Sequence, residues 1–121
     1  MEFHSGDTAW RQYLLRDSDE EHWLHVPPST AEPMALLNVS TEQPGSGTTI
    51  TVGGKEYTQT AAGTATAEVV GESGKQEGRA VSFRRFSGEA GALVFDYDWG
   101  GRRQTFVGRT LDPLEIKIYA V

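Results

Sequence analysis

Asp96 and Asp98 are the residues of this chain whose type and spacing come closest to a catalytic or metal-binding pair. Side chains two apart in a β-strand point to the same face, so the two carboxylates would lie side by side. The Gly100-Gly101 pair that follows predicts a two-residue turn, which sets Asp98 opposite Arg103. We therefore prefer a cross-strand ion pair on a solvated outer face, and this interpretation gives the carboxylates no catalytic role.

Two adjacent arginines, Arg84 and Arg85, could in principle bind an anion. Neighbouring residues of a strand point to opposite faces, so the two guanidinium groups diverge instead of converging on one ligand. Pairing with carboxylates of adjacent strands is the preferred interpretation, and recognition of a local anionic group by one of them stays open.

The histidines do not form a metal site. The chain has three histidines and no cysteine, and His22 and His25 are three residues apart, which places them on opposite faces of a strand. The segment Gly71 to Lys75 resembles a phosphate-binding loop only superficially, because it lacks the glycine spacing and the Ser or Thr after the lysine. We expect no catalytic residue, no metal and no cofactor.

Two hairpins position these side chains. Leu93, Phe95, Tyr97 and Trp99 alternate with smaller or polar residues, which predicts a half-buried strand before the Gly100-Gly101 turn and a return strand over Arg102 to Arg109. A second Gly-Gly pair joins the strands Thr48 to Val52 and Lys55 to Gln59, with Ile50 opposite Tyr57. Further strands are predicted over Ala9–Arg16, His22–Val26, Met34–Val39, Thr64–Gly71, Arg79–Phe86 and Leu114–Val121.

The sequence predicts an all-β, single-domain antiparallel sandwich or strongly curved barrel-like sheet of about eight to nine strands, with little or no helix. A helix over Thr8 to Leu15, capped by Asp7, is the alternative for the first segment. The length of 121 residues fits one domain. We divide the chain into an N-terminal arm, residues 1–8, and a β domain, residues 9–121.

The net charge of −6 limits the partners. An acidic protein repels the phosphate backbone, so we expect no nucleic-acid binding. The sequence shows neither a secretory signal nor an apolar run long enough to cross a bilayer. We expect a soluble, cytoplasmic protein and leave peripheral membrane association open.

Five aromatic side chains could line a ligand groove, although in a chain with few aliphatic residues aromatics more often form the core: Trp10, Trp23, Tyr57, Tyr97 and Trp99. We expect Trp99, next to the turn, to be the most exposed of them. The candidate binding residues are Trp23, Arg84, Arg85, Tyr97, Trp99 and Arg103.

Several segments occur in the order and spacing of a known family: Trp10–Leu15, Glu21–Leu24, Gly54–Tyr57, Thr64–Ala67 and Leu114–Tyr119. They resemble the bacterial family called domain of unknown function 4178. The resemblance implies a bacterial β-rich domain, in some relatives encoded near polyamine-synthase-like enzymes and small membrane proteins. It supplies no activity and no catalytic residue. Relatives usually carry a Gly-Asp-led strand pair before the tryptophan motif, whereas Gly6-Asp7 stands directly before it here, so we expect that portion to be missing or shortened.

The leading functional hypothesis is a non-catalytic β-rich module that binds a protein partner or supports a membrane-associated system, through exposed strand edges and the arginine-rich half. The first alternative is a barrel that binds a small anionic or aromatic molecule, with an enzymatic activity left open. It predicts an internal pocket of a few hundred Å³, whereas a filled interior would reject it. The second alternative is a structural or assembly subunit that self-associates through an edge strand. The oligomeric state is not predicted.

Overall fold

The computed structural model describes residues 1–17, 20–28, 32–68, 70–71, 74–75 and 78–111. Most of these residues lie in β-strands, and the others form loops, turns and one short 3₁₀ turn, η1 (Glu89–Gly91). The strands are β1 (Glu2–Ser5), β2 (Thr8–Asp17), β3 (Glu20–Val26), β4 (Ala35–Ser40), β5 (Thr49–Val52), β6 (Lys55–Glu68), β7 (Val70–Gly71), β8 (Gly74–Lys75), β9 (Arg79–Ser87), β10 (Ala92–Asp98) and β11 (Arg103–Thr110).

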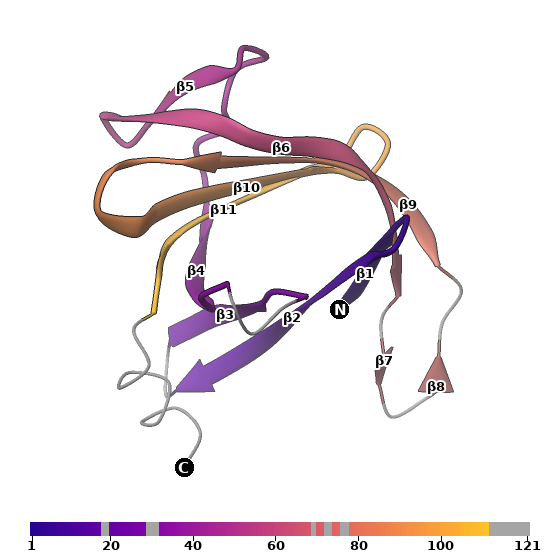
Figure 1. The fold of residues 1–121 in the computed structure, drawn as a ribbon. Helices are drawn as coiled ribbons and strands as arrows, with labels where there is room; N and C mark the ends of the chain where they lie inside the picture. The colour runs from indigo at the N-terminus through magenta and orange to yellow at the C-terminus, as the bar shows by residue number, and fades with distance from the viewer. Residues whose placement is uncertain (18–19, 29–31, 69, 72–73, 76–77, 112–121) are drawn as a thin grey trace.

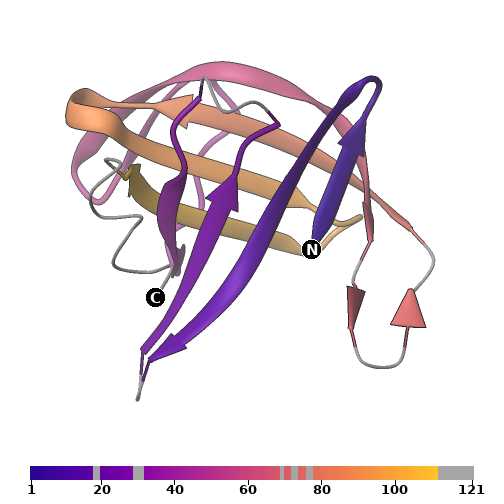
Figure 2. The same ribbon diagram turned by 60° about the horizontal axis from the view of Figure 1, so that its bottom comes forward.

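Eight of the strands form a closed antiparallel barrel. The order around the barrel is β1-β2-β3-β4-β11-β10-β9-β6, and the pairing of β1 with β6 closes it. In Figures 1 and 2 the strands β6, β9, β10 and β11 form one wall, and β1 to β3 form the opposite wall. The ninth strand, β5, pairs with the beginning of β6 outside the barrel. The barrel-like alternative of the predicted fold class is therefore confirmed.

Both predicted glycine turns are present. Gly53, Gly54, Gly100 and Gly101 all have positive φ, which a residue without a Cβ adopts at little cost. The turns set the predicted registers, with Ile50 opposite Tyr57 and Asp98 opposite Arg103. Register in turn fixes which side chains of β10 point inward.

An extra residue in β6 allows this one strand to serve two hydrophobic cores. Gln59 pairs with Phe86 and Ala61 with Arg85, so Thr60 is a β-bulge without a partner. Before the bulge, Tyr57 packs outside the barrel with Ile50, Val52, Phe86 and Val94. After the bulge, the alternation is inverted and Ala65 and Ala67 point into the barrel. The inner core consists of Phe3, Trp10, Ala35, Leu37, Ala65, Ala67, Val81, Leu93, Phe95, Tyr97 and Phe106.

Three predicted elements differ from the structure. Thr8–Asp17 is a strand, so the helical alternative is wrong. The predicted strands 55–59 and 64–71 are joined by the bulge into β6, which ends at Glu68. The predicted arm contains β1, which was too short to show an alternating pattern and whose Phe3 is fully buried. The predicted strand Leu114–Val121 lies outside the described residues.

Candidate functional site

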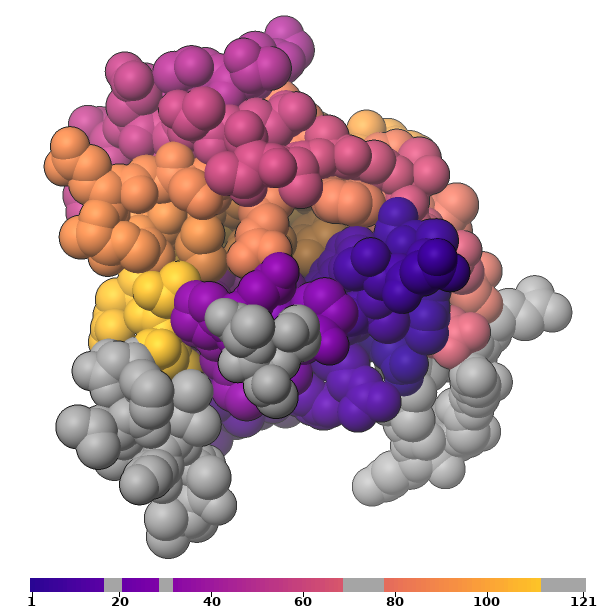
Figure 3. Space-filling model, viewed as in Figure 1, coloured from indigo at the N-terminus to yellow at the C-terminus, as the bar shows by residue number. Residues whose placement is uncertain are grey.

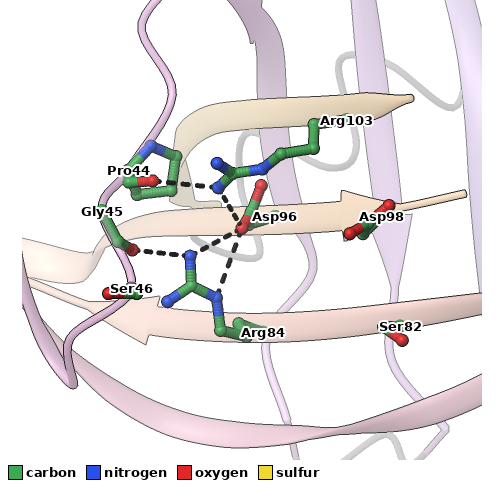
Figure 4. A pocket seen from close by; sticks show the side chains of 8 residues that line it. All are labelled: Pro44, Gly45, Ser46, Ser82, Arg84, Asp96, Asp98 and Arg103. Atoms are coloured by element: carbon green, nitrogen blue, oxygen red, sulfur yellow. Dashed lines mark hydrogen bonds and ion pairs between the residues drawn. The ribbon is translucent and has the colours of Figure 1, made fainter. Parts of the chain in front are cut away.

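A cluster of charged residues lies on the outer face of β9, β10 and β11. Asp96 accepts hydrogen bonds from Arg84 Nη2 and Arg103 Nη2, each at 2.8 Å to the same carboxylate oxygen. Thr105 Oγ1 donates to its other oxygen at 3.1 Å. Figure 4 shows that the two guanidinium groups also reach the backbone carbonyls of Pro44 and Gly45. We call Arg84, Asp96, Arg103 and Thr105 the outer cluster.

The outer cluster corrects the prediction of a solvated outer face. Asp96 is only 5% exposed, because the segment before β5 crosses over its strand. Its ion pairs are with Arg84 and Arg103, whereas the predicted pairing was between Asp98 and Arg103. The hydrogen-bonding capacity of the buried Asp96 carboxylate is therefore taken up by the two guanidinium groups and the Thr105 hydroxyl group. The outer cluster therefore holds the segment around Pro44 and Gly45 against the barrel.

Asp98 has a different task from Asp96. Its Oδ1 accepts hydrogen bonds from the backbone amides of Gly100 and Gly101, both at 3.0 Å. The hydrogen bonds from Gly101 and Gly100 lower the pKa of the Asp98 carboxyl group below its usual range. Asp98 is exposed and stabilises the turn, so the two carboxylates of β10 do not act as a pair.

A second polar region lies inside the barrel, at the end where the β1–β2 turn is located. A pocket of about 250 Å³, which we call the inner pocket, is lined by Ser5, Thr8, Trp10, His25, Pro28, Glu32, Ala61, Phe83, Arg85 and Phe95. Figure 3 shows the surface hollowed between the residues of β1 and β2 and those of β6 and β9, which supply most of this lining. Thr8, Glu32 and Ala61 are exposed, so the inner pocket is open to solvent.

His25 is the most unusual residue of the inner pocket. Its side chain is only 2% exposed, and neither ring nitrogen has a hydrogen-bond partner among the residues that the structure describes. The imidazole instead contacts the Phe95 ring, with the ring centroids 4.6 Å apart. Burial, with a smaller contribution from the charge of Arg85, lowers the pKa of His25 to about 3, so the imidazole is neutral at pH 7. A neutral imidazole offers one donor and one acceptor, and a buried group left without partners costs about 1–3 kcal/mol.

Arg85 brings a positive charge to the same pocket. The pairing of Arg85 with Phe95 places its guanidinium carbon 5.1 Å from the centre of the Phe95 ring. The side chain is half-buried, and among the described residues no hydrogen bond or ion pair to its guanidinium group is found. Its neighbour Arg84 points to the opposite face into the outer cluster, as the predicted divergence requires.

A hydrogen-bonded group lies deeper in the barrel. The Tyr97 hydroxyl accepts a hydrogen bond from Gln12 Nε2 at 2.9 Å, and Trp10 Nε1 lies 3.3 Å from the same oxygen. Burial raises the pKa of Tyr97 far above its usual value, so the phenol remains protonated. The Gln12 Oε1 atom is buried and has no partner in the described part of the chain. The aromatic side of the inner pocket is thus fixed through Trp10.

The predicted binding residues are distributed over three regions. Arg84 and Arg103 belong to the outer cluster, and Arg85 lines the inner pocket. Trp23 and Trp99 pack against the inner core and are partly buried, and Tyr97 lies within it. Of the six, Arg85 alone lines the inner pocket.

Three residues of the inner pocket are absent from the predicted binding residues: Trp10, for which packing was preferred over a ligand groove, Phe83, which was given no role, and His25, which was considered only as a metal ligand. The signal was nevertheless present for His25. In the alternation of β3 it shares a face with Trp23, which predicts an inward-pointing histidine.

Among the residues that the structure describes, no three His, Asp or Glu side chains are grouped so that they could hold a metal ion. The same residues include no helix with the length and apolar character needed to span a membrane.

Comparison with known proteins identifies one family. The family model described as a domain of unknown function (DUF4178) matches residues 1–113. No curated protein and no solved structure matches the chain. The match includes β1 and all strands of the barrel, and therefore covers both the inner pocket and the outer cluster.

Proposed function

The chain belongs to the DUF4178 family, and for this member we propose that the barrel binds a small organic molecule in the inner pocket. The observation that carries the proposal is His25, which lines a pocket open to solvent and whose two buried ring nitrogens have no hydrogen-bond partner among the described residues. Buried polar groups are normally hydrogen-bonded, and exceptions call for an explanation. A ligand that hydrogen-bonds to His25 supplies one.

The size and lining of the inner pocket support a small ligand. Its volume of about 250 Å³ lies just below the usual range for ligand pockets, so a molecule with one ring is the appropriate size. Trp10 and Phe83 meet edge to face, with ring centroids 5.0 Å apart, and form an apolar wall. An apolar wall with a few polar groups is typical of small-molecule sites.

Closure of the barrel argues against the hypothesis that the protein binds a partner through its strand edges. Closure gives each barrel strand two neighbours, and in the nine-stranded sheet of the described residues only β5 has a single neighbour. Edge strands are the usual sites of pairing with another chain. This sheet therefore has little unpaired strand edge to which another chain could bind, and we prefer the small-molecule hypothesis.

Two adjacent alanines of β6 permit a matched test. Ala61 lines the inner pocket opposite Arg85, whereas Ala62 pairs with Arg84 and lies on the other face. We expect Ala61→Trp to fill the pocket and Ala62→Trp to leave it open, because both residues are exposed and neither belongs to a core.

The measurement is protein-observed NMR of the full chain with a panel of one-ring compounds that are neutral, anionic or cationic. Compounds that bind should shift the Trp10 indole signal in the unmodified protein and in Ala62→Trp, and lose this effect in Ala61→Trp. The proposal is wrong if no compound shifts that signal, or if binding survives unchanged in Ala61→Trp.

A further inference from the structure

The inner pocket has charge and hydrogen-bonding groups that narrow the class of ligand. We infer that it selects a one-ring carboxylate bearing a hydroxyl group, with the carboxylate paired to Arg85 and the hydroxyl hydrogen-bonded to His25. This inference rests on the proposed function and specifies the chemistry of the same site.

The charge of the ligand follows from Arg85. Its guanidinium group has five N–H donors and contacts the Phe95 ring, yet no carboxylate among the described residues is paired with it. Arg84, the next residue, shows the contrasting case, since Asp96 takes up its charge at 2.8 Å. A carboxylate is the planar anion that matches a guanidinium group in two parallel hydrogen bonds.

The ring of the ligand follows from the walls of the pocket. Trp10, Phe83 and Phe95 provide aromatic surfaces, and aromatic pairs gain stability beyond simple burial when they stack offset or edge to face. Trp10 is held in place on its other side by the Phe3 ring, at 5.3 Å between ring centroids. A preformed wall of this kind lowers the ordering cost of binding.

The hydroxyl group follows from His25. A neutral imidazole donates through one nitrogen and accepts through the other, and a hydroxyl group, which can either accept or donate, can pair with one of the two. A purely apolar ring would leave both nitrogens of His25 without partners after binding, at an unfavourable free energy, whereas a hydroxyl group gives one of them a partner. Ligands with a hydroxyl group are therefore favoured over the same ring without one.

The experiment is isothermal titration calorimetry on the full 121-residue chain with benzoate, its three monohydroxy isomers and benzyl alcohol. We expect at least one hydroxybenzoate to bind roughly 3- to 10-fold more tightly than benzoate, the effect of one net hydrogen bond. Benzoate should bind roughly 10-fold or more tightly than benzyl alcohol, the effect of a charged partner.

Variants assign each preference to its residue. Arg85→Gln should remove the preference for benzoate over benzyl alcohol, whereas Arg102→Gln, an exposed arginine in the Gly-Gly turn, should preserve it. His25→Phe should abolish the preference for the hydroxyl group and retain binding of benzoate. Thermal unfolding of each variant verifies that it is folded, and Arg85→Lys provides a second variant that keeps the charge while removing the bidentate geometry.

The outcomes separate this inference from the proposed function. Equal affinity for benzoate and benzyl alcohol overturns the inference. If both compounds nevertheless shift the Trp10 indole signal, the small-molecule pocket of the proposed function is upheld. A preference for the carboxylate that persists in Arg85→Gln also overturns it. The absence of binding for every compound in the calorimeter and by NMR rejects both.

Discussion

The outer cluster and the inner pocket each contain a buried polar side chain beside an arginine, but the two differ in their hydrogen bonding. In the outer cluster, Asp96 is buried and has hydrogen bonds from Arg84, Arg103 and Thr105. In the inner pocket, His25 is equally buried and has none to any residue that the structure describes. The two regions share β9 and β10 and use opposite faces of these two strands. Polar groups that satisfy one another stabilise the fold, whereas a buried polar group without a partner calls for an explanation, which for His25 is the ligand that we propose.

The largest expected effect on the free energy of unfolding comes from a substitution in the outer cluster, where the polar groups are hydrogen-bonded to one another. Asp96→Ala leaves two guanidinium groups beside each other without their carboxylate, and we expect the free energy of unfolding to fall by about 3 kcal/mol. This is the low end of the range for buried pairs, because the two arginine side chains keep 21% and 31% of their exposure. Chemical denaturation measures it.

Asp98→Asn is the matched control on the same face of β10. It keeps the oxygen that accepts from the turn amides, so the free energy of unfolding should change by less than about 1 kcal/mol. Equal losses in the two variants would show that the outer cluster does not hold the fold together.

An intermediate effect comes from the two adjacent arginines. Arg84→Gln should lower the free energy of unfolding by about 2 kcal/mol and leave ligand affinity unchanged, because Arg84 pairs with buried Asp96. Arg85→Gln should change the free energy of unfolding by less than about 1 kcal/mol and weaken binding of benzoate. Denaturation and calorimetry on both variants give the pattern, and the same response to both substitutions would remove the distinction between the two regions.

The smallest expected change in the free energy of unfolding concerns His25. Its sign tests whether the imidazole lacks a partner in the free protein. His25→Phe removes two unsatisfied nitrogens from a site of similar shape, so at pH 7 we expect the free energy of unfolding to rise by about 1 kcal/mol. A clear fall would mean that the imidazole has a partner in the free protein.

The same variant predicts a pH dependence. The pKa of His25 is lowered from 6.5 to about 3, so between these values the unfolded chain binds a proton that the folded chain does not. The free energy of unfolding of the unmodified protein should therefore fall with decreasing pH, relative to His25→Phe, by about 1.4 kcal/mol per pH unit below pH 6.5. Arg85 and Glu32 line the same pocket and are common to both proteins. Parallel pH profiles would contradict the buried, neutral state of His25.

The local geometry of the fold could be predicted from the sequence because it depends on short-range rules. Positive φ at Gly100 and Gly101 follows from the lack of a Cβ, and the register of the hairpin follows from the turn. The opposite orientation of Arg84 and Arg85 follows from the period of two. The closure of the barrel could not be predicted, because it depends on β1, which has a single large apolar residue in four.

The candidate site was harder to predict for the same reason. The burial of Asp96 depends on a segment about fifty residues earlier in the chain that crosses its strand, and no local pattern reveals this. The inner pocket combines His25 from β3 with Arg85 from β9, strands that are not neighbours in the sheet. Only the closed barrel brings them to the same pocket.

The bulge at Thr60 has a consequence for changes in chain length. It inverts which face the side chains of β6 present, and so separates the half that packs with Tyr57 from the half that carries Ala65 and Ala67. Deleting one residue there would expose the apolar side of one half to water, whichever half kept its place. Insertions and deletions should therefore be tolerated at the Gly53-Gly54 turn and excluded at Thr60. The position of Thr60 matters for the length of the strand, although its side chain belongs to neither core.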